Sequence, residues 1–365
     1  MSHHGDGTRA VRAGLPEPKE GHPFLPGPEF AGPFAVHGDP KDASYVYGRY
    51  GNRTWTAVES ALGELEGGQA VLFASGMAAL AAVLLTQFEG DAPILVPSDG
   101  YATGRELAHE RHRGEVREVP TRELAQAPVD GAGCVWAETP SNPGLDVCDI
   151  AALAERCRAA DALFVVDNTT PTPLGQRPLE LGADLSMASA SKSLSGHSDL
   201  VLGYVAARDP ERVEALRDWR RLTGSIPGPF EAWLLHRSLA TLHVRLERQC
   251  ANALAIAEAL AGREQVTGVR YPGLESDPAH PVAARQMSRF GPMVSFDLGD
   301  RDRADRFLAA CELVTEATSF GGLHTTAERR ARWGDGVPEG FIRLSAGCED
   351  GRDLVDDLGQ ALDSV

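Results

Sequence analysis

Residues 163–169 read LFVVDNT, and residues 189–203 read SASKSLSGHSDLVLG. The four apolar residues from Leu163 to Val166 are typical of a strand that is buried on both faces within a parallel sheet. Asp167 follows this strand directly, at the carboxyl end where α/β sheets place their ligand sites. Lys192 lies among serines and glycine, which leave room for a flat ring to approach. Together the two segments predict an α/β fold with a ligand site at one edge of its sheet.

Strands and helices alternate on both sides of these segments. Further strand candidates are the apolar stretches 70–74, 94–96, 134–137 and 200–206. Helical spacing marks residues 58–65, the residues from Gly76 onward, and residues 150–160. Alternation of this kind indicates an α/β domain with a parallel or mixed sheet.

The composition and the periodicity of the sequence change twice along the chain. Residues 1–45 are rich in proline and glycine and show little periodicity, so we expect an irregular arm that lies on another part of the protein. After Gly228 a long helix or a pair of helices is predicted over 232–260, followed by strand candidates and a final amphipathic helix. We therefore expect an arm (1–45), a large α/β domain (46–228) and a smaller α+β domain (229–365).

The composition limits the classes of function. The chain has 365 residues, of which 42% are hydrophobic and 24% are charged, as is ordinary for a globular protein. Its net charge of -17 opposes binding to nucleic acid or to an anionic membrane surface, so we expect a small-molecule substrate. Because no apolar run could span a bilayer and no signal-peptide core is present, we expect a cytoplasmic protein. The cysteines and histidines lack metal-ligand spacing, so no metal site is predicted.

The carboxylate and the lysine of the first two segments suit one cofactor. A carboxylate at the position of Asp167 can keep a pyridine nitrogen protonated, so that the ring accepts electrons from a substrate. Lys192 can form a Schiff base and later act as a base, and Ser189 and Ser191 can hydrogen-bond a phosphate. Taken singly, Lys192 could be a solvated loop lysine and Asp167 a turn residue that caps the next helix. Their combination favours pyridoxal 5'-phosphate (PLP).

A second candidate site is FASGMAAL, residues 73–80, where a buried strand runs into a helix through Ser75 and Gly76. Free N–H groups at the N-terminus of a helix bind phosphate readily. By itself this junction is a weak signal, since many α/β proteins use one only as a turn.

The chain resembles the PLP enzymes of cysteine and methionine metabolism, which include cystathionine γ-lyase, cystathionine γ-synthase, cystathionine β-lyase and methionine γ-lyase. The motifs that carry the resemblance occur in order over nearly the whole chain: TRAVRAG (8–14), YGRYGN (47–52), LEGG (65–68), ASGMAA (74–79), ETPSNP (138–143), VVDNT (165–169), SASKSLSGHSD (189–199), YPGL (271–274), MVSF (293–296), SFGG (319–322) and IRLSAGCED (342–350). The resemblance implies fold type I: an arm, a large PLP domain with a mostly parallel sheet of the seven-stranded type, and a small C-terminal domain. It also implies a homotetramer with sites shared across a dimer interface.

The resemblance further implies roles for single residues. Lys192 would carry the cofactor as a Schiff base, Asp167 would pair with the pyridine nitrogen, and Tyr101 would stack on the ring and exchange protons with the substrate. The phosphate would be held by Gly76, Met77, Ser189 and Ser191, and from the neighbouring subunit by Tyr47 and Arg49. The substrate would be held by Arg343, whose planar fork suits the α-carboxylate, and beside it by Asn142 and Ser319.

Three of these residues also have plainer interpretations. Tyr101 could be a half-buried aromatic residue at a strand end, Asn142 a turn residue before Pro143, and Arg343 a surface salt-bridge partner. The ordered motifs around Tyr101 and Arg343 favour the functional interpretation.

The chain departs from the family pattern near the expected site. DGYATGRE stands where the family usually has Tyr-Gly-Gly-Thr, so the loop after Tyr101 and the place of Arg105 are open. Methionine γ-lyases often carry a cysteine just after that tyrosine, where this chain has Ala102 and Thr103. Thr318 stands where cystathionine γ-lyases commonly have glutamate. These differences leave the preferred substrate open.

The function that we expect is γ-elimination on a sulfur amino acid, with cystathionine giving cysteine, 2-oxobutanoate and ammonia. Cystathionine γ-synthase and methionine γ-lyase activities are alternatives within the family. A different class is a catalytically silent relative that keeps the fold as a binding module. Loss of the lysine, its aspartate or the carboxylate-binding arginine would favour that class, and this chain has Lys192, Asp167 and Arg343.

Overall fold

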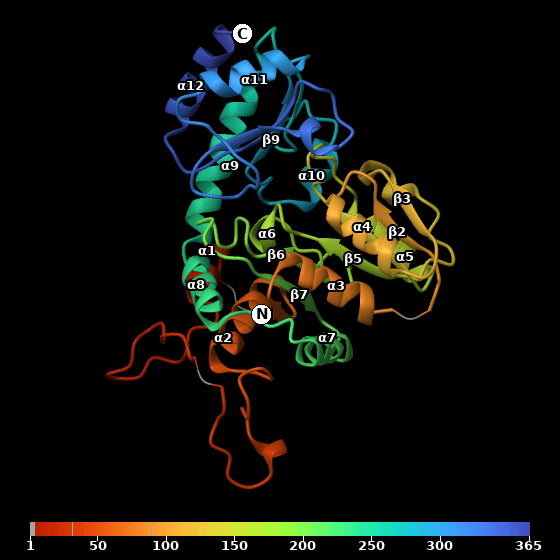
Figure 1. Ribbon diagram of the computed structural model, residues 1–365, viewed down its shortest axis with the longest axis vertical. Coiled ribbons are helices and arrows are strands. Elements are labelled where there is room, and N and C mark those ends of the chain that lie inside the picture. Colours follow the sequence, from red (N-terminus) through yellow and green to blue (C-terminus); the bar gives the residue numbers. More distant parts are fainter. Residues whose placement is uncertain (1–3, 31, 89) are drawn as a thin grey trace.

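The computed structural model describes residues 4–30, 32–88 and 90–365. Two sheets, each with helices packed on it, lie one above the other, and an arm extends away from them (Figure 1). The long helix α9 (Leu242–Ala261) runs alongside the smaller sheet and reaches the larger part of the molecule (Figure 1). The predicted α/β architecture is confirmed.

Seven strands form the large sheet, in the spatial order β1-β7-β6-β5-β4-β2-β3. In that order they are β1 (Gln69–Phe73), β7 (Gly203–Ala207), β6 (Leu185–Ser189), β5 (Leu163–Asp167), β4 (Cys134–Glu138), β2 (Ile94–Pro97) and β3 (Val116–Val119). Strand β7 is antiparallel to both of its neighbours, and the other neighbouring pairs are parallel. The sheet is therefore mostly parallel, as predicted.

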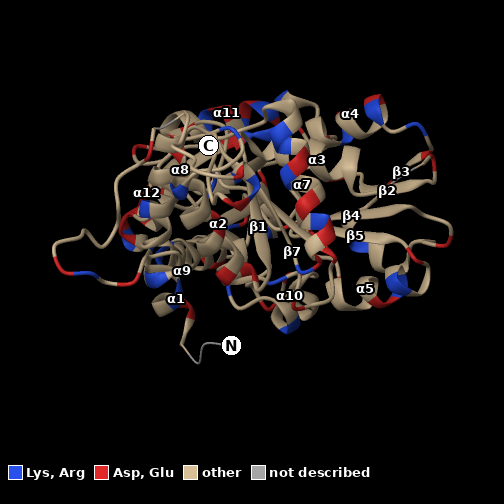
Figure 2. Cartoon of the chain, turned by 90° about the horizontal axis from the view of Figure 1, so that it is seen from below, with Lys and Arg blue, Asp and Glu red and all other residues tan. Residues whose placement is uncertain are grey.

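Helices cover both faces of the large sheet. One face is covered by α3 (Gly76–Thr86), α4 (Ala102–Arg111) and α7 (Pro210–Thr223). The other is covered by α2 (Arg53–Glu66), α5 (Ile150–Ala159), α6 (Thr172–Gly175) and α8 (Pro229–Leu239). Figure 2 shows that charged residues gather on helices and loops around the strands, which carry few of them. Burial on both faces explains why β5 is an uninterrupted apolar run rather than an alternating one.

The second sheet has five strands, in the order β10-β11-β12-β9-β8. They are β10 (Thr315–Glu316), β11 (Thr326–Arg329), β12 (Phe341–Ser345), β9 (Met293–Asp297) and β8 (Thr267–Arg270). Helices α9, α11 (Arg301–Ala310) and α12 (Gly351–Asp363) share an apolar core with this sheet. The remaining helices are α1 (Asp6–Arg12), α10 (His280–Gln286), η1 (Pro40–Asp42), η2 (Thr121–Gln126) and η3 (Arg330–Trp333). None of the helices within the described ranges is long and apolar enough to cross a membrane.

The helical region predicted over 232–260 is a pair, α8 and α9. Leu235 of α8 and Leu246 of α9 pack in the same core as α2, whereas α9 from Ala253 onward packs with the second sheet. Judged by packing, the change from one core to the other therefore lies inside α9. The division at residue 228 stays a prediction.

The prediction of an irregular arm over 1–45 is wrong for Asp6–Arg12, and residues 1–3 and 31 of that arm lie outside the described residues. Residues Asp6–Arg12 form α1, and Ala10 and Ala13 are buried in the core that contains α2. So short a helix gains its stability from tertiary packing rather than from a periodic pattern, which is why the sequence does not show it. The segment that follows extends away from both sheets (Figure 1) and exposes Phe24 and Phe30.

The strand predicted over 200–206 begins only at Gly203. The hydroxyl of Ser191 donates to the carbonyl oxygen of Leu202 at 3.2 Å and accepts from its backbone N–H at 3.0 Å. The Ser191 side chain thus binds the backbone groups of Leu202 that a neighbouring strand would otherwise bind. The hydrogen-bonded ladder of β7 therefore starts at Gly203.

Candidate active site

Glu138, Asp167 and Ser189 end the adjacent strands β4, β5 and β6, so their side chains start from one edge of the sheet. Asp167 Oδ1 accepts hydrogen bonds from the backbone N–H of Thr169 at 2.9 Å and from its hydroxyl at 2.5 Å. The same hydroxyl accepts from the backbone N–H of Ser189 at 2.9 Å. Thr169 therefore ties the ends of two strands together and fixes the direction of the Asp167 carboxyl.

The electrostatic environment of Asp167 suits a cationic partner. Burial raises the pKa of Asp167 to about 6, although both hydrogen bonds from Thr169 act in the opposite direction. Since these hydrogen bonds come from neutral groups, a cation beside the carboxyl would stabilise its charged form.

Lys192 lies on a turn after β6 that α9 holds in place. Its carbonyl oxygen accepts from the backbone N–H of Gly196 at 2.8 Å. Arg245 of α9 donates to the carbonyl oxygens of Ser193 at 2.7 Å and Leu194 at 3.1 Å. Gly196 has a φ of 71°, and a Cβ there would collide with the guanidinium of Arg245. The turn that presents Lys192 therefore favours glycine at position 196, and Arg245 binds its carbonyl groups.

The ammonium group of Lys192 reaches a loop of the second sheet. Nζ donates to Ser319 Oγ at 2.7 Å and lies 5.3 Å from the ring centre of Phe320. Burial and the positive charge of Arg343 lower the pKa of Lys192, against the opposing effect of Glu328. The neutral amine, which can act as a base, is thus available at a lower pH than in an ordinary lysine.

Arg343, on β12, is only 4% exposed and is held from three sides. Its Nη1 donates to Asn142 Oδ1 at 2.7 Å, and its Nη2 donates to the carbonyl oxygen of Ser319 at 3.0 Å and to Glu328 Oε1 at 2.5 Å. Glu328 is also its register partner on β11. The structure thus brings the predicted substrate group of Asn142, Ser319 and Arg343 together, next to Lys192.

The start of α3 approaches the end of β6 closely. Gly76 and Met77 are the first residues of α3, and the hydroxyl of Ser75 caps the helix. A Cβ on Gly76 would lie 2.9 Å from Ser189 Cβ, and a Cβ on Gly203 would collide with the carbonyl oxygen of Ser75. Two glycines therefore allow the N–H groups of a helix N-terminus to lie beside a serine, which is an arrangement that binds phosphate.

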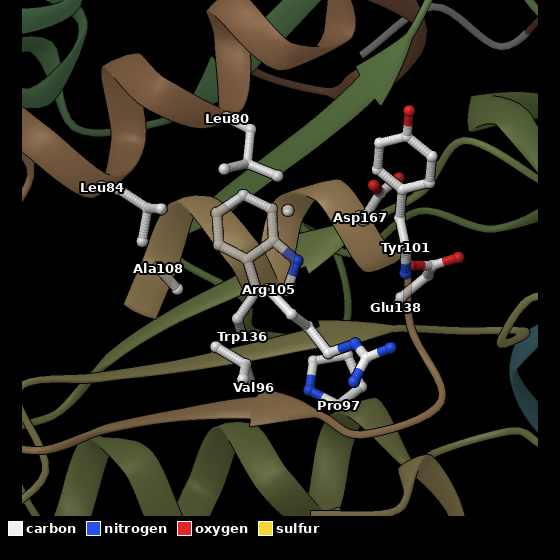
Figure 3. Close-up of a pocket in the computed structure, with 11 residues that line it drawn as sticks. Leu80, Leu84, Val96, Pro97, Tyr101, Arg105, Ala108, Trp136, Glu138 and Asp167 are labelled. Atoms are coloured by element: carbon white, nitrogen blue, oxygen red, sulfur yellow. The ribbon is translucent and has the colours of Figure 1, made fainter. Parts of the chain in front are cut away.

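A pocket opens beside this edge of the sheet (Figure 3). The residues that line it are Leu80, Leu84, Val96, Pro97, Tyr101, Gly104, Arg105, Ala108, Trp136, Glu138 and Asp167. Tyr101 is 50% exposed, and its backbone N–H donates to Glu138 Oε2 at 2.6 Å. Tyr101, Glu138 and Asp167 give this pocket its polar end, and the remainder is largely apolar (Figure 3).

A model of the family described as Cys/Met metabolism PLP-dependent enzyme matches residues 32–363. The chain belongs to this family. A relative from Streptomyces coelicolor, named "Putative cystathionine gamma-lyase", is 58% identical and covers 99% of this chain and 94% of that protein. L-methionine gamma-lyase from Pseudomonas putida is 37% identical, over 88% of this chain and 86% of that protein. The structure of cystathionine gamma synthase from Xanthomonas oryzae pv. oryzae, in complex with aminoacrylate and cysteine, aligns with a TM-score of 0.93 at 36% identity, over 99% of this chain and 98% of that one.

The cofactor of the family is PLP, and the residues present fit it. The glycine-lined contact between α3 and Ser189 offers a place for the phosphate. Asp167 offers a carboxyl that a protonated nitrogen would stabilise, and Lys192 offers an amine of lowered pKa. An amino-acid substrate fits the same group, since Arg343 offers a buried cation beside Lys192.

Tyr47 and Arg49 lie apart from this group within one chain. Arg49 Nη1 donates to the carbonyl oxygen of Arg221 on α7 at 2.6 Å, and its guanidinium lies over the rings of Tyr47 and Tyr50 at 5.7 Å and 4.9 Å. Tyr47 is 42% exposed. Their predicted role at the phosphate of a neighbouring subunit stays a prediction.

The contacts of Ser191 bear on its predicted role at the phosphate, and those of Arg105 settle where its side chain lies. The hydroxyl of Ser191 already donates to Leu202, so it would have to turn away from that oxygen to donate to a phosphate. Arg105 lines the pocket behind Tyr101, and its Nη1 donates to Glu118 Oε2 at 2.8 Å, which fixes the position that the sequence left open.

Sequence reasoning missed five residues that shape the site. They are Glu138, Thr169, Arg245, Phe320 and Glu328. Glu138, Thr169 and Phe320 lie inside motifs that carry the family resemblance, so those motifs could have pointed to them. Arg245 and Glu328 lie outside them and carried no signal that the sequence alone could show.

Proposed function

We propose that the protein is a PLP-dependent carbon–sulfur lyase that performs γ-elimination on a sulfur amino acid. Its proposed substrate is cystathionine, which with one water molecule gives cysteine, 2-oxobutanoate and ammonia. The observation that carries the proposal is the contact of both Lys192 and Arg343 with Ser319, because it puts a base next to a buried anchor for an α-carboxylate.

Each residue of the site has a part in this reaction. When bound, PLP supplies an electron sink for the charge that develops on the substrate carbons. Arg343 and Asn142 would bind the α-carboxylate, and Asp167 would hold the proton of the pyridine nitrogen. Lys192, once free, would take the Cα proton, for which its lowered pKa suits it.

The leaving group needs a proton as well. Removal of a second proton, from Cβ, allows the thiol to leave from Cγ. Tyr101 is the proposed donor to that sulfur, since it is half exposed at the polar end of the pocket that Asp167 also lines. The γ-lyase activity is favoured over its alternatives by the name of the Streptomyces coelicolor relative.

Cystathionine γ-synthase is the second candidate. The close structural match to cystathionine gamma synthase from Xanthomonas oryzae pv. oryzae favours it. So does Thr318, which is exposed beside Ser319 where cystathionine γ-lyases commonly have glutamate.

A product analysis tests these alternatives. The purified enzyme with PLP is incubated separately with cystathionine, with methionine, and with O-succinylhomoserine plus cysteine, and the products are identified by mass. We expect 2-oxobutanoate and cysteine from cystathionine as the fastest reaction, and none from the Lys192→Ala variant. Faster formation of cystathionine from the third mixture would favour the synthase instead, and turnover of methionine alone would favour methionine γ-lyase. A protein that binds no PLP and turns over none of them would be a silent relative.

We also propose that the protein works as a homotetramer with sites shared between subunits. Phe24 and Phe30 of the arm, and Tyr47 just after it, are exposed aromatic residues that support this proposal, since exposed apolar surface marks protein–protein interaction sites. A cytoplasmic location likewise stays a prediction.

A further inference from the structure

Glu138 is a buried acid that no step of the proposed reaction uses. It ends β4 directly opposite Asp167, the last residue of β5, in the parallel ladder. The residue is 8% exposed, and its Oε2 accepts the backbone N–H of Tyr101 at 2.6 Å (Figure 3). A buried carboxyl therefore connects the strand end beside Asp167 to the start of α4.

The loop before Tyr101 is pressed against this carboxyl. A Cβ on Gly100 would lie 3.0 Å from Glu138 Oε2 and 2.6 Å from Pro97 Cγ, so a side chain there would push the loop away. Asp99 Oδ1 accepts from the backbone N–H of Thr121 at 2.8 Å and from its hydroxyl at 2.9 Å. The backbone of the loop is thus anchored just before Tyr101 as well as at Tyr101 itself.

The side chain of Tyr101 has little else to hold it. Half of the residue is exposed, so packing fixes the ring only in part. A displacement of the backbone by a fraction of an ångström would move the phenol by more, and proton transfer is sensitive to such displacements. The backbone anchor therefore sets the point from which the phenol starts.

Glutamine is a close mimic of Glu138 in both charge and shape. Burial and then the neighbouring Asp167 raise the pKa of Glu138 well above its usual range; the N–H of Tyr101 and Arg105 oppose this, and Asp99 adds to it. Because two adjacent buried carboxyls do not both ionise readily, the raised pKa of Glu138 favours its neutral form. Glutamine has nearly the same shape and keeps the acceptor oxygen.

We propose that Glu138 is a positioning residue of the reaction, which holds the backbone N–H of Tyr101 and so fixes the phenol in the pocket that Asp167 also lines. This inference rests on the proposed function, since that function gives Tyr101 its proton transfer. In this proposal Glu138 has no chemical step of its own, and its whole effect passes through the backbone N–H of Tyr101.

The hydrogen bond is first tested in the protein without cofactor. Hydrogen exchange, followed by mass spectrometry, reports on the amide of Tyr101. We expect exchange to be slow in the wild type and in Glu138→Gln, and about tenfold or more faster in Glu138→Ala. Exchange in Glu138→Ala at the wild-type rate would contradict the inference, because it would mean that Glu138 does not hold this N–H.

The functional effect is tested with a double-mutant cycle on the loaded enzyme. We expect Glu138→Ala to lower kcat by about tenfold to a hundredfold, as loss of a buried hydrogen bond at a reacting group does, and Glu138→Gln to lower it by less than about threefold. In a Tyr101→Phe background, Glu138→Ala should change kcat by less than about twofold, because the group that it positions is already missing. Should Glu138→Ala fail to fold, Glu138→Asp replaces it, since the shorter side chain withdraws the acceptor, and the same pattern is expected.

The control is Glu118→Gln, which changes an acid that binds Arg105 of α4 from the exposed side. It should leave kcat and the exchange at Tyr101 unchanged. Fold-changes in kcat that multiply in the double variant would show that Glu138 acts independently of Tyr101, and an equal loss in Glu138→Gln would show that its acceptor is not what matters. An unchanged kcat in Tyr101→Phe would overturn both the role of the phenol and the inference. A damaged Tyr101→Phe together with a normal Glu138→Ala would overturn the inference alone.

Discussion

Lys192, on the turn after β6, and Ser319, on the loop after β10, are joined by a hydrogen bond of 2.7 Å between Nζ and Oγ. Ser319 has a φ of 79°, a left-handed backbone conformation that is uncommon for a residue other than glycine. Its carbonyl oxygen accepts from Arg343 at the same time. One residue in an uncommon conformation thus sets the spacing between the proposed base and the proposed carboxylate anchor.

Lys192→Ala should abolish turnover and the visible absorbance of bound cofactor, because the lysine is both tether and base. The fold should remain, since the turn is held by Arg245 through backbone carbonyl groups that the substitution leaves in place. Activity assays, absorbance spectra and circular dichroism measure these three properties. A variant that keeps more than a small fraction of the activity would rule out the assignment.

Asp167→Asn should keep some bound cofactor but lose most of the activity, because a neutral pyridine ring is a poor electron sink. The amide oxygen can still accept from Thr169, so the strand ends should stay in place. The measurement is kcat together with the dissociation constant of PLP. If turnover were unchanged, another residue would have to protonate the ring.

Arg343→Lys should lower kcat/KM for every amino-acid substrate by a similar factor of about tenfold to a hundredfold, mainly through KM. Lysine offers a point charge in place of the planar fork that Asn142, Ser319 and Glu328 now orient. The dissociation constant of PLP should not change, and neither should the ranking of substrates. Selective sparing of methionine or of cystathionine would mean that Arg343 binds a distal group instead.

Mixing inactive Lys192→Ala subunits with inactive Arg49→Ala subunits should restore part of the activity. If Arg49 acts across an interface, a mixed dimer contains one site that lacks both defects. Activity is measured after subunit exchange, with the mixed oligomers verified by native mass spectrometry. No recovery in such oligomers would indicate that Arg49, which here contacts α7 of its own chain, serves its own subunit.

Glu66→Gln should change how stability depends on pH. Glu66 is fully buried; one oxygen accepts from the hydroxyl of Tyr204 at 2.5 Å and the other has no hydrogen-bond partner. Burial raises its pKa from 4.5 to about 7, so between these pH values the folded protein binds more protons than the unfolded chain, and the free energy of unfolding falls as pH rises. The substitution should remove about 3 kcal/mol of that fall.

Denaturant unfolding of the wild type and Glu66→Gln, at several pH values across this range, measures the effect. Glu64→Gln is the matched control, because Glu64 lies on the same helix but is exposed. A parallel dependence on pH in the wild type and in Glu66→Gln would show that Glu66 does not keep its proton in the folded protein.

The sequence by itself determined the large sheet and the residues that serve its chemistry. Buried parallel strands are continuous apolar runs, so β5 and the position of Asp167 at its end could be read directly from LFVVD. Lys192 and Arg343 stand in ordered motifs, and Tyr101 lies between two of them, which is why the family could be predicted. Apolar strand runs and short motifs are local patterns of residue types, so they can be recognised from the sequence alone.

Only the tertiary structure decided which elements hold those residues. The helix α1 is stabilised by packing against α2. Strand β7 begins after Leu202 because the hydroxyl of Ser191 binds the backbone of Leu202. Arg245 holds the turn that carries Lys192. Glu138 and Tyr101 are 37 positions apart, and Lys192 and Ser319 are 127 positions apart. Contacts over such distances depend on how whole elements pack, and no local pattern of residue types records that packing.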